Sequence, residues 1–229
     1  MDFIIGGLIK AIQLLMSGDK ETCSAVISTV TVSGYSMMAS LIMGIPSGFL
    51  LGYCNFAGKR QVRMLVDTLL ALPTVFIGLL VYAFISRLGP FGNFGLLFTL
   101  PGIAAGQTLL ALPIVIALTA TAVESMDQQL RITLISLGVN RTQLLLSSLW
   151  EVRYGILAAA VTAYGRVLTE VGISMMVGGN IKWHTRTITT AIALETNKGL
   201  FATGIALGLV LMSIAFMVNL SLSFLRKRN

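Results

Sequence analysis

Charged residues are scarce in this chain, making up 11% of its 229 residues. A soluble domain of similar length carries roughly 25%, so there are too few charges here to cover a water-facing surface. Hydrophobic residues account for 55% of the chain, and its mean hydropathy is +0.88. A bilayer is the simplest solvent for such a composition, and the sequence predicts an all-α integral membrane protein.

Cysteine and histidine are equally rare. Cys23 and Cys54 lie at opposite ends of one apolar segment, roughly 45 Å apart if that segment is helical, which is beyond disulfide reach. His184 is the single histidine, and no Cys, His and carboxylate residues recur at ligand spacing. The sequence therefore predicts neither a disulfide nor a metal site.

Two further absences narrow the function. No Gly-x-x-x-x-Gly-Lys-Ser/Thr motif occurs, so the chain lacks the loop that cradles nucleotide phosphates. No nucleophile and base stand in a catalytic pattern, which makes an enzyme the least supported class.

The chain has 16 Lys and Arg against 9 Asp and Glu, but its basic residues cluster beside apolar runs. That pattern is typical of a positive-inside membrane protein, and we expect no nucleic-acid partner.

Long apolar runs predict about five spanning helices. A span needs about 20 apolar residues, and four stretches with at most one charge reach that length. A fifth stretch is apolar apart from Arg166 and Glu170, and it ends in the helix-stop signal Gly178-Gly179-Asn180. The predicted spans, within one transmembrane domain over residues 22–226, lie near 25–54, 64–87, 101–123, 155–177 and 200–225.

Residues 1–21 are expected to form an external segment. Its apolar run, Phe3–Met16, covers only about 21 Å as a helix and contains Lys10 and Gln13, so we expect an interfacial helix or a partial span.

The basic clusters Lys59–Arg63 and Arg226–Arg228 fall on the same side of the five predicted spans. That side should be cytoplasmic, which places the N-terminus outside and the C-terminus inside.

The connection over residues 124–154 is long and strongly patterned. Leucines recur at helical spacing on both sides of Gly138: Leu130, Leu134, Leu137, Leu144, Leu145 and Leu149. The pattern predicts two short amphipathic helices hinged at Gly138-Val139-Asn140, with Asn140 or Thr142 capping the second. Such an apolar projection suits a groove on a partner protein. The alternative is a helix that lies on its own bundle.

The run Ile135–Gln143 resembles the EAA loop of bacterial ABC-importer permeases. Ile132, Thr133 and Leu134 stand at its acidic-Ala-Ala positions, and Glu151 stands where a proline is usual, whereas the glycine and the spacing remain. Without the acidic residue, the resemblance no longer implies a specific salt bridge to the partner, but it still implies the docking helix.

The resemblance extends downstream over nearly the whole chain. Tyr164–Gly172 followed by Met176–Ile181 is similar to the molybdate/tungstate/sulfate branch of these permeases. Thr185–Gly199 resembles tungstate permeases more closely than molybdate ones.

This resemblance implies an ABC type-1 importer permease fold in the bacterial cytoplasmic (inner) membrane. It implies a homodimer around a pathway for a tetrahedral oxyanion, tungstate first, with molybdate or sulfate as alternatives. The implied partners are a cytoplasmic ABC ATPase dimer, which would use ATP and Mg, and an external tungstate-binding protein. The chain itself would bind no cofactor. The residues implied in ATPase coupling are Leu134, Leu137, Gly138, Val139, Asn140, Arg141, Leu144 and Leu145. A stand-alone channel or secondary carrier is the alternative from another class.

Two other groups are candidate site residues. Arg166 and Glu170 lie four apart on one predicted helix, hence on one face. Each costs about 2.5–3.5 kcal/mol at the bilayer centre, so they form either a gate lining the pathway or a structural intramembrane pair, and both interpretations stay open. Thr185, Arg186 and Thr187 are candidates for an external mouth. The same residue types also cap interfacial helices, and we favour that interpretation.

Overall fold

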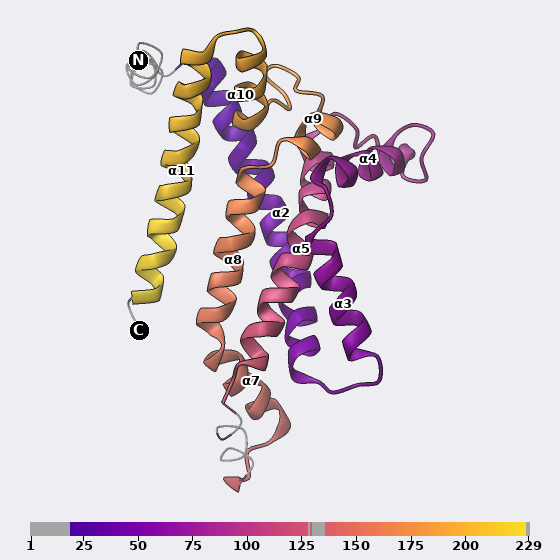
Figure 1. The fold of residues 1–229 in the computed structure, drawn as a ribbon, viewed down its shortest axis with the longest axis vertical. Helices are drawn as coiled ribbons and strands as arrows, with labels where there is room; N and C mark the ends of the chain where they lie inside the picture. Colours follow the sequence, from indigo (N-terminus) through magenta and orange to yellow (C-terminus); the bar gives the residue numbers. More distant parts are fainter. Residues whose placement is uncertain (1–18, 128, 130–135, 228–229) are drawn as a thin grey trace.

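The computed structural model describes residues 19–127, 129 and 136–227, and within these ranges the secondary structure is helical without strands. The expected N-terminal helix lies outside the described residues, as do residues 128 and 130–135 of the 124–154 connection, which include Leu130 and Leu134. The longer helices run roughly parallel in one bundle (Figure 1). The helices are α2 (Lys20–Tyr53), α3 (Lys59–Leu70), α4 (Thr74–Ile85), α5 (Leu100–Glu124), α7 (Arg141–Glu151), α8 (Arg153–Leu168), α9 (Gly172–Gly178), α10 (Ile188–Asn197) and α11 (Phe201–Lys227).

The centre of the bundle is the contact between α2 and α5. Gly44, Gly48 and Gly52 repeat every fourth residue on α2, so they share one face. A Cβ atom added to Gly48 would lie 2.6 Å from the carbonyl oxygen of Ile116, and one added to Gly52 would lie 2.7 Å from that of Ala120. The two backbones therefore touch directly, as small residues permit between helices in lipid.

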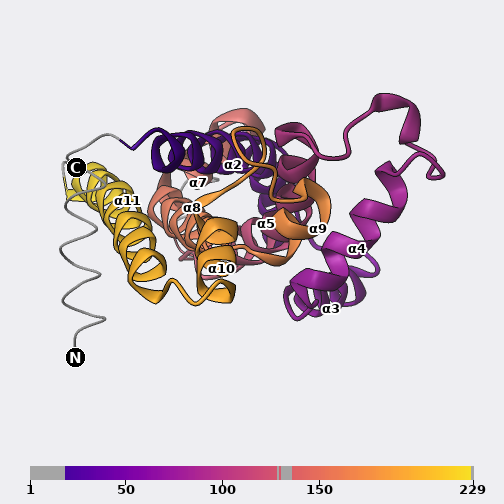
Figure 2. The ribbon, with the colours of Figure 1, turned by 90° about the horizontal axis from the view of Figure 1, so that it is seen from above.

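The predicted span over residues 64–87 was wrong as a single helix. The chain forms α3 and α4 instead, and their axes are bent by 99° at a short break. The break falls at Pro73, which has extended backbone angles (φ −61°, ψ 128°). Proline disfavours a helical conformation in the residue before it, so α3 cannot continue through this point. Seen from above, α3 and α4 lie on the side of the bundle opposite α11 (Figure 2).

The predicted span over residues 155–177 was wrong in the same way. Helix α8 ends at Leu168, and a separate short helix, α9, begins at Gly172. The buried carboxylate of Glu170 accepts the backbone N–H of Ile173 at 3.0 Å, which satisfies a donor in the first turn of α9. The break is thus held by a side chain that the sequence pattern placed inside a continuous helix.

The other three expected spans correspond to long helices. The range 25–54 lies within α2 apart from its last residue, the range 101–123 lies within α5, and the range 200–225 corresponds to α11. These three helices are long and apolar enough to cross a membrane, and two bent pairs, α3 with α4 and α7 with α8, bring the total to as many as five. The prediction of about five spans is confirmed to this extent.

The glycine contact leads to a stability prediction. Gly48→Ala forces its methyl group into the backbone of α5 and should destabilise the bundle by about 1–3 kcal/mol, seen as a lower Tm in detergent. Gly34 also lies on α2, but an added Cβ there has nothing within 4 Å, so Gly34→Ala is the matched control and should leave Tm unchanged or slightly raised. Equal Tm values for the two variants would contradict the close contact.

Candidate functional site

Helix α7 begins with a complete capping box. The side-chain oxygen of Asn140 accepts the N–H of Gln143 at 2.8 Å, and the Gln143 side chain accepts the N–H of Asn140 at 3.1 Å. Gly138 precedes the cap with φ +74°, a left-handed conformation that glycine adopts without strain. The predicted cap at Asn140 is confirmed, and Thr142 is not the cap. The hinge stays a prediction, because most of the first of the two helices that it would join lies outside the described residues.

Helix α7 lies at one end of the bundle (Figure 1), and several of its apolar side chains are exposed. Leu146 and Trp150, four residues apart on one face, are 62% and 65% exposed, and Leu137 before the hinge is 73% exposed. Leu145 is also exposed, whereas Leu144 is half-buried. The sequence pattern found the helix but missed Leu146 and Trp150, although their spacing of four was the available signal. Val139 is half-buried, and Arg141 is the first residue of the helix.

An arginine fixes the elbow between α7 and α8, whose axes are bent by 57°. The Arg153 guanidinium lies 4.6 Å from the centre of the Trp150 ring and 4.4 Å from that of Tyr154. Its Nη1 donates to the carbonyl oxygen of Trp150 at 2.6 Å. These cation–π and hydrogen-bonding contacts tie the projecting helix to the first turn of α8.

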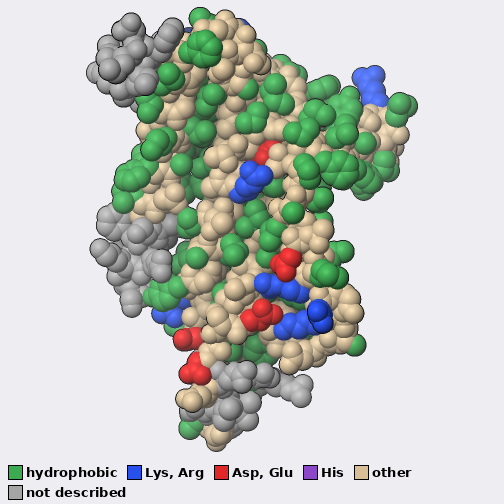
Figure 3. Space-filling view, in the orientation of Figure 1, with side chains coloured by type: hydrophobic (Ala, Val, Ile, Leu, Met, Phe, Trp, Pro, Cys, Tyr) green, Lys and Arg blue, Asp and Glu red, His purple; other side chains and the backbone are tan. Residues whose placement is uncertain are grey.

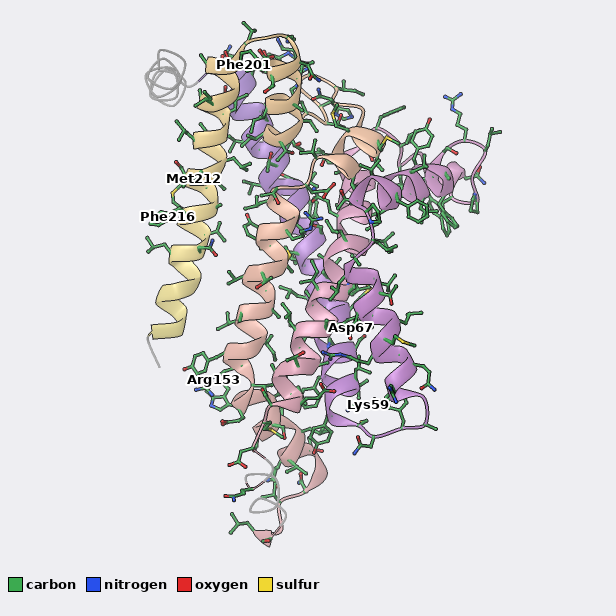
Figure 4. The ribbon with its side chains drawn as sticks, in the orientation of Figure 1. Lys59, Asp67, Arg153, Phe201, Met212 and Phe216 are labelled. Atoms are coloured by element: carbon green, nitrogen blue, oxygen red, sulfur yellow. The ribbon has the colours of Figure 1, made fainter. Side chains whose placement is uncertain are left out.

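Ion pairs hold the other end of the same connection. Glu124, the last residue of α5, lies 3.4 Å from Lys59 Nζ and 3.7 Å from Arg63 Nη1. Arg63 also donates to the hydroxyl of Thr121 at 2.7 Å. The side chains line an open cavity of about 710 Å³ at the same end of the bundle as α7, and Figure 4 shows Lys59 and Asp67 along α3. The segment that carries α7 is therefore anchored to the bundle on both sides.

Arg166 and Glu170 are not paired, and the expectation that they share one helix face was wrong. Helix α8 ends at Leu168, so Glu170 belongs to the break that follows it. Glu170 is 3% exposed, and its carboxylate faces the start of α9. Arg166 is exposed in the last turn of α8, and no ion pair or hydrogen bond of its side chain is found within the described ranges. The structural-pair interpretation fails, and a role in a gate stays a prediction.

A buried polar chain surrounds the α8–α9 break. The Gln107 amide donates to the Ser174 hydroxyl and accepts from the Ser36 hydroxyl, each at 3.4 Å. The backbone carbonyl of Glu170 accepts the hydroxyl of Thr189 at 3.0 Å. These contacts join α2, α5, α9 and α10 around the break, so its geometry depends on four helices.

The candidate mouth residues are structural in this conformation. Thr185 is fully buried and its hydroxyl donates to the carbonyl of Gly178 at 2.5 Å. Thr187 is 3% exposed and forms the N-cap of α10, so the helix-cap interpretation is confirmed for Thr187. Arg186 pairs with Glu21 at the start of α2 and donates to the side-chain oxygen of Asn180 at 3.1 Å. None of these three side chains is free for an anion.

Ion pairs and a helix cap stabilise the end of the bundle where α2 begins. Lys182 Nζ lies 2.6 Å from the Glu21 carboxylate, which it shares with Arg186. Beside them, the backbone N–H and the hydroxyl of Thr22 donate to Asp19 and hold the pKa of its carboxyl below the usual value. In the described part of the chain, no three His, Cys, Asp or Glu side chains come together to hold a metal.

Fold and site together define the class: a multi-pass helical membrane protein with a capped amphipathic helix, α7, between α5 and α8. Residues 44–229 match the family described as binding-protein-dependent transport system inner membrane component, and the chain belongs to this family of ABC-transporter permeases.

Two of the relatives match nearly the whole chain, and a third matches about three quarters of it. The tungstate uptake system permease protein TupB of Campylobacter jejuni is 46% identical over 96% of this chain and 92% of its own length. The protein of the same name from Peptoclostridium acidaminophilum is 34% identical over 96% of both. The molybdenum transport system permease protein ModB of Escherichia coli is 29% identical over 73% of this chain and 77% of its own length.

A solved structure shares the fold. The crystal structure of a bacterial alginate ABC transporter, in complex with its alginate-bound periplasmic protein, contains a chain that matches with a TM-score of 0.74. The match covers 92% of this chain and 80% of the alginate transporter chain, and the two sequences are 19% identical. The likeness shows that this chain has the fold of an ABC type-1 permease.

Substitutions of Glu170 test whether its carboxylate holds the break between α8 and α9. Glu170→Gln keeps an oxygen that can accept the Ile173 N–H and should unfold at nearly the wild-type temperature. Glu170→Leu leaves that donor buried without a partner and should lower stability by about 1–3 kcal/mol, measured as thermal unfolding in detergent. If both variants unfold alike, the side chain does not hold the break.

Proposed function

We propose that this chain is the permease subunit of an ATP-driven importer for a tetrahedral oxyanion, with tungstate as the substrate. It would act as a homodimer in the bacterial inner membrane. The observation that carries the proposal is the projecting helix α7, with uncovered Leu146 and Trp150, on a chain that is 46% identical to a tungstate uptake permease.

The energy would come from a partner. The sequence has no phosphate-binding loop of the Gly-x-x-x-x-Gly-Lys-Ser/Thr type, so ATP and Mg would be bound by a cytoplasmic ATPase dimer. Apolar side chains exposed at the end of a rigid helix favour insertion into a protein groove, because burying each leucine gains about 1.5–3 kcal/mol. The anchors at Arg153 and Glu124 would transmit movement of α7 to α8, α5 and α3.

The two ends of the bundle would face different partners. Lys59, Arg60 and Arg63 lie at the same end as α7, and α11 runs from the α10 end back toward it (Figure 1). The positive-inside bias then makes this end cytoplasmic. The opposite end, with the α9–α10 connection and the Glu21 ion pairs, would meet the external binding protein that delivers the anion.

Tungstate and molybdate are nearly isosteric, so we place their discrimination in the binding protein. Calorimetry of the binding protein encoded beside this chain should give its tightest Kd for tungstate, with molybdate weaker and sulfate much weaker. Tightest binding of sulfate would overturn the tungstate assignment and leave the permease role standing.

The role of α7 leads to a prediction for the assembled transporter. Leu145→Asp combined with Leu146→Asp places two charges on the docking face, where each would lose the burial of an apolar side chain. We expect the anion-stimulated ATPase rate to fall about tenfold or more, while Tm stays near wild type because both side chains are uncovered in the chain alone.

The matched control is Leu146→Met, which keeps an apolar side chain of similar size and should retain most of the coupled activity. Full anion-stimulated ATP hydrolysis in the double aspartate variant would exclude α7 as the coupling helix.

A further inference from the structure

The outward face of α8 differs from the uncovered faces of α2 and α11. Its exposed residues recur at helical spacing and are small or polar: Ala158, Thr162, Gly165 and Arg166, followed by the exposed C-cap residue Thr169. None of the large exposed apolar side chains belongs to α8. The opposite face, with Ala159, Ala163 and Val167, is buried, and its contacts include the Met37, Ala111 and Val115 cluster.

The uncovered faces of α2 and α11 show what a lipid-facing surface looks like in this chain. Ile27, Met38 and Ile42 are exposed along α2, and Met212 and Phe216 are exposed along α11. Figure 4 shows the two α11 side chains pointing away from the bundle. The outward face of α8 has no large exposed apolar side chain. We therefore infer that this face does not contact lipid.

The position of Arg166 also indicates that the outward face of α8 does not contact lipid. It stands 13 residues beyond Arg153, the first residue of α8, which is about 20 Å along the helix axis in a membrane whose apolar core is about 30 Å thick. An arginine at such depth faces water or a partner, because hydrocarbon cannot solvate its charge. Within the described ranges the Arg166 guanidinium has neither an acidic partner nor a hydrogen bond, so its five N–H donors are available.

The break after α8 is what leaves the arginine unpaired. On a continuous helix Glu170 would lie one turn away and neutralise it. In the structure the Glu170 carboxylate is buried and accepts the N–H of Ile173, on the far side of the break. The one acid that the sequence places beside Arg166 is therefore used elsewhere.

Two threonines are exposed near Arg166 at helical spacing, four residues before it and three after it. Thr162 donates to the carbonyl of Ala158 at 2.9 Å, and Thr169 donates to that of Gly165 at 3.1 Å. Bonds of this kind, back to the helix's own carbonyls, are easily exchanged for another acceptor. In space-filling view, charged side chains gather on one face, over the lower ends of α3 and α5 (Figure 3).

We propose that the outward face of α8 is one wall of the anion pathway. On this face Arg166, with the hydroxyls of Thr162 and Thr169, forms half of a weak binding site for a tetrahedral dianion. The other half comes from the same residues of a second copy, so that two guanidinium groups face a charge of minus two. The inference rests on the proposed function, since it needs the homodimer and an anionic substrate.

The geometry also explains why such a site does not trap its ligand. One arginine per copy offers a planar fork to the oxyanion, but the threonine hydroxyls must leave their helix carbonyls before they can add to it. A permeant ion has to be bound weakly enough to leave. A site without buried cations or preformed hydroxyl donors meets that requirement.

Thiol labelling of the full-length chain in membrane vesicles tests the proposal. Cys23 and Cys54, both free, are first replaced by serine. Thr162→Cys and Ala158→Cys report on the α8 face, and Met212→Cys on α11 is the lipid-facing control. Each is treated with an anionic or a cationic methanethiosulfonate of similar size. Both reagents should label the two α8 positions at least about tenfold faster than Met212→Cys, because only α8 meets water.

The charge of Arg166 is read from the ratio of the two labelling rates. Arg166→Gln in the Thr162→Cys chain should lower the anionic-to-cationic ratio about tenfold, since a unit charge a few ångströms away changes the local potential by that order. Arg166→Lys should keep the ratio near that of the parent, and Arg87→Gln, which removes an exposed arginine outside α8, should not change it. A merely structural arginine would not produce this pattern.

The possible outcomes test the anion site and the identity of the substrate separately. Slow labelling at both α8 positions, or an unchanged ratio in Arg166→Gln, overturns the site. Slower labelling of Thr162→Cys in the presence of tungstate supports both the site and the proposed function. Protection by sulfate or phosphate but not by tungstate supports the anion site and contradicts the tungstate assignment.

Discussion

Direct contact between the backbones of α2 and α5 is the constraint on which the rest of the structure depends. The glycines at 44, 48 and 52 remove the side chains that would separate the two helices. With α5 held this close, Glu124 at its end meets Lys59 and Arg63 of α3, and α8 packs its small residues Ala159 and Ala163 into the same core. In lipid, where apolar surface gains nothing from avoiding water, such close packing must hold the helices together.

The two ends of the segment that carries α7 are each held to this core. Its start is tied to α3 through Glu124, and its end is tied to α8 through the stacked Arg153. A push on the exposed leucines of α7 would therefore reach α3 and α8 together. Under the proposed function, the face of α8 that carries Arg166 lies on a helix that movement of α7 would shift, and this would connect ATP hydrolysis in a partner to the proposed anion pathway.

The sequence predicted the helical class, the spans at α2, α5 and α11, and the capped helix α7, because long apolar runs and caps are local signals. It misplaced two breaks for different reasons. Pro73 was a local signal that the apolar composition outweighed. The break at 169–171 depends on the Glu170 carboxylate and on contacts with Ser174 and Thr189, which are set by tertiary packing. The apparent pair of Arg166 and Glu170 was lost for the same reason.

The central claim is that this chain moves its anion only when an ATPase drives it. Uptake of radiolabelled tungstate into proteoliposomes tests this most directly, with the chain and the binding protein present and the ATPase either included or left out. The account predicts ATP-dependent accumulation against a gradient with the ATPase and no uptake above empty liposomes without it. Equal tungstate uptake in both preparations would show a channel or secondary carrier and contradict the account.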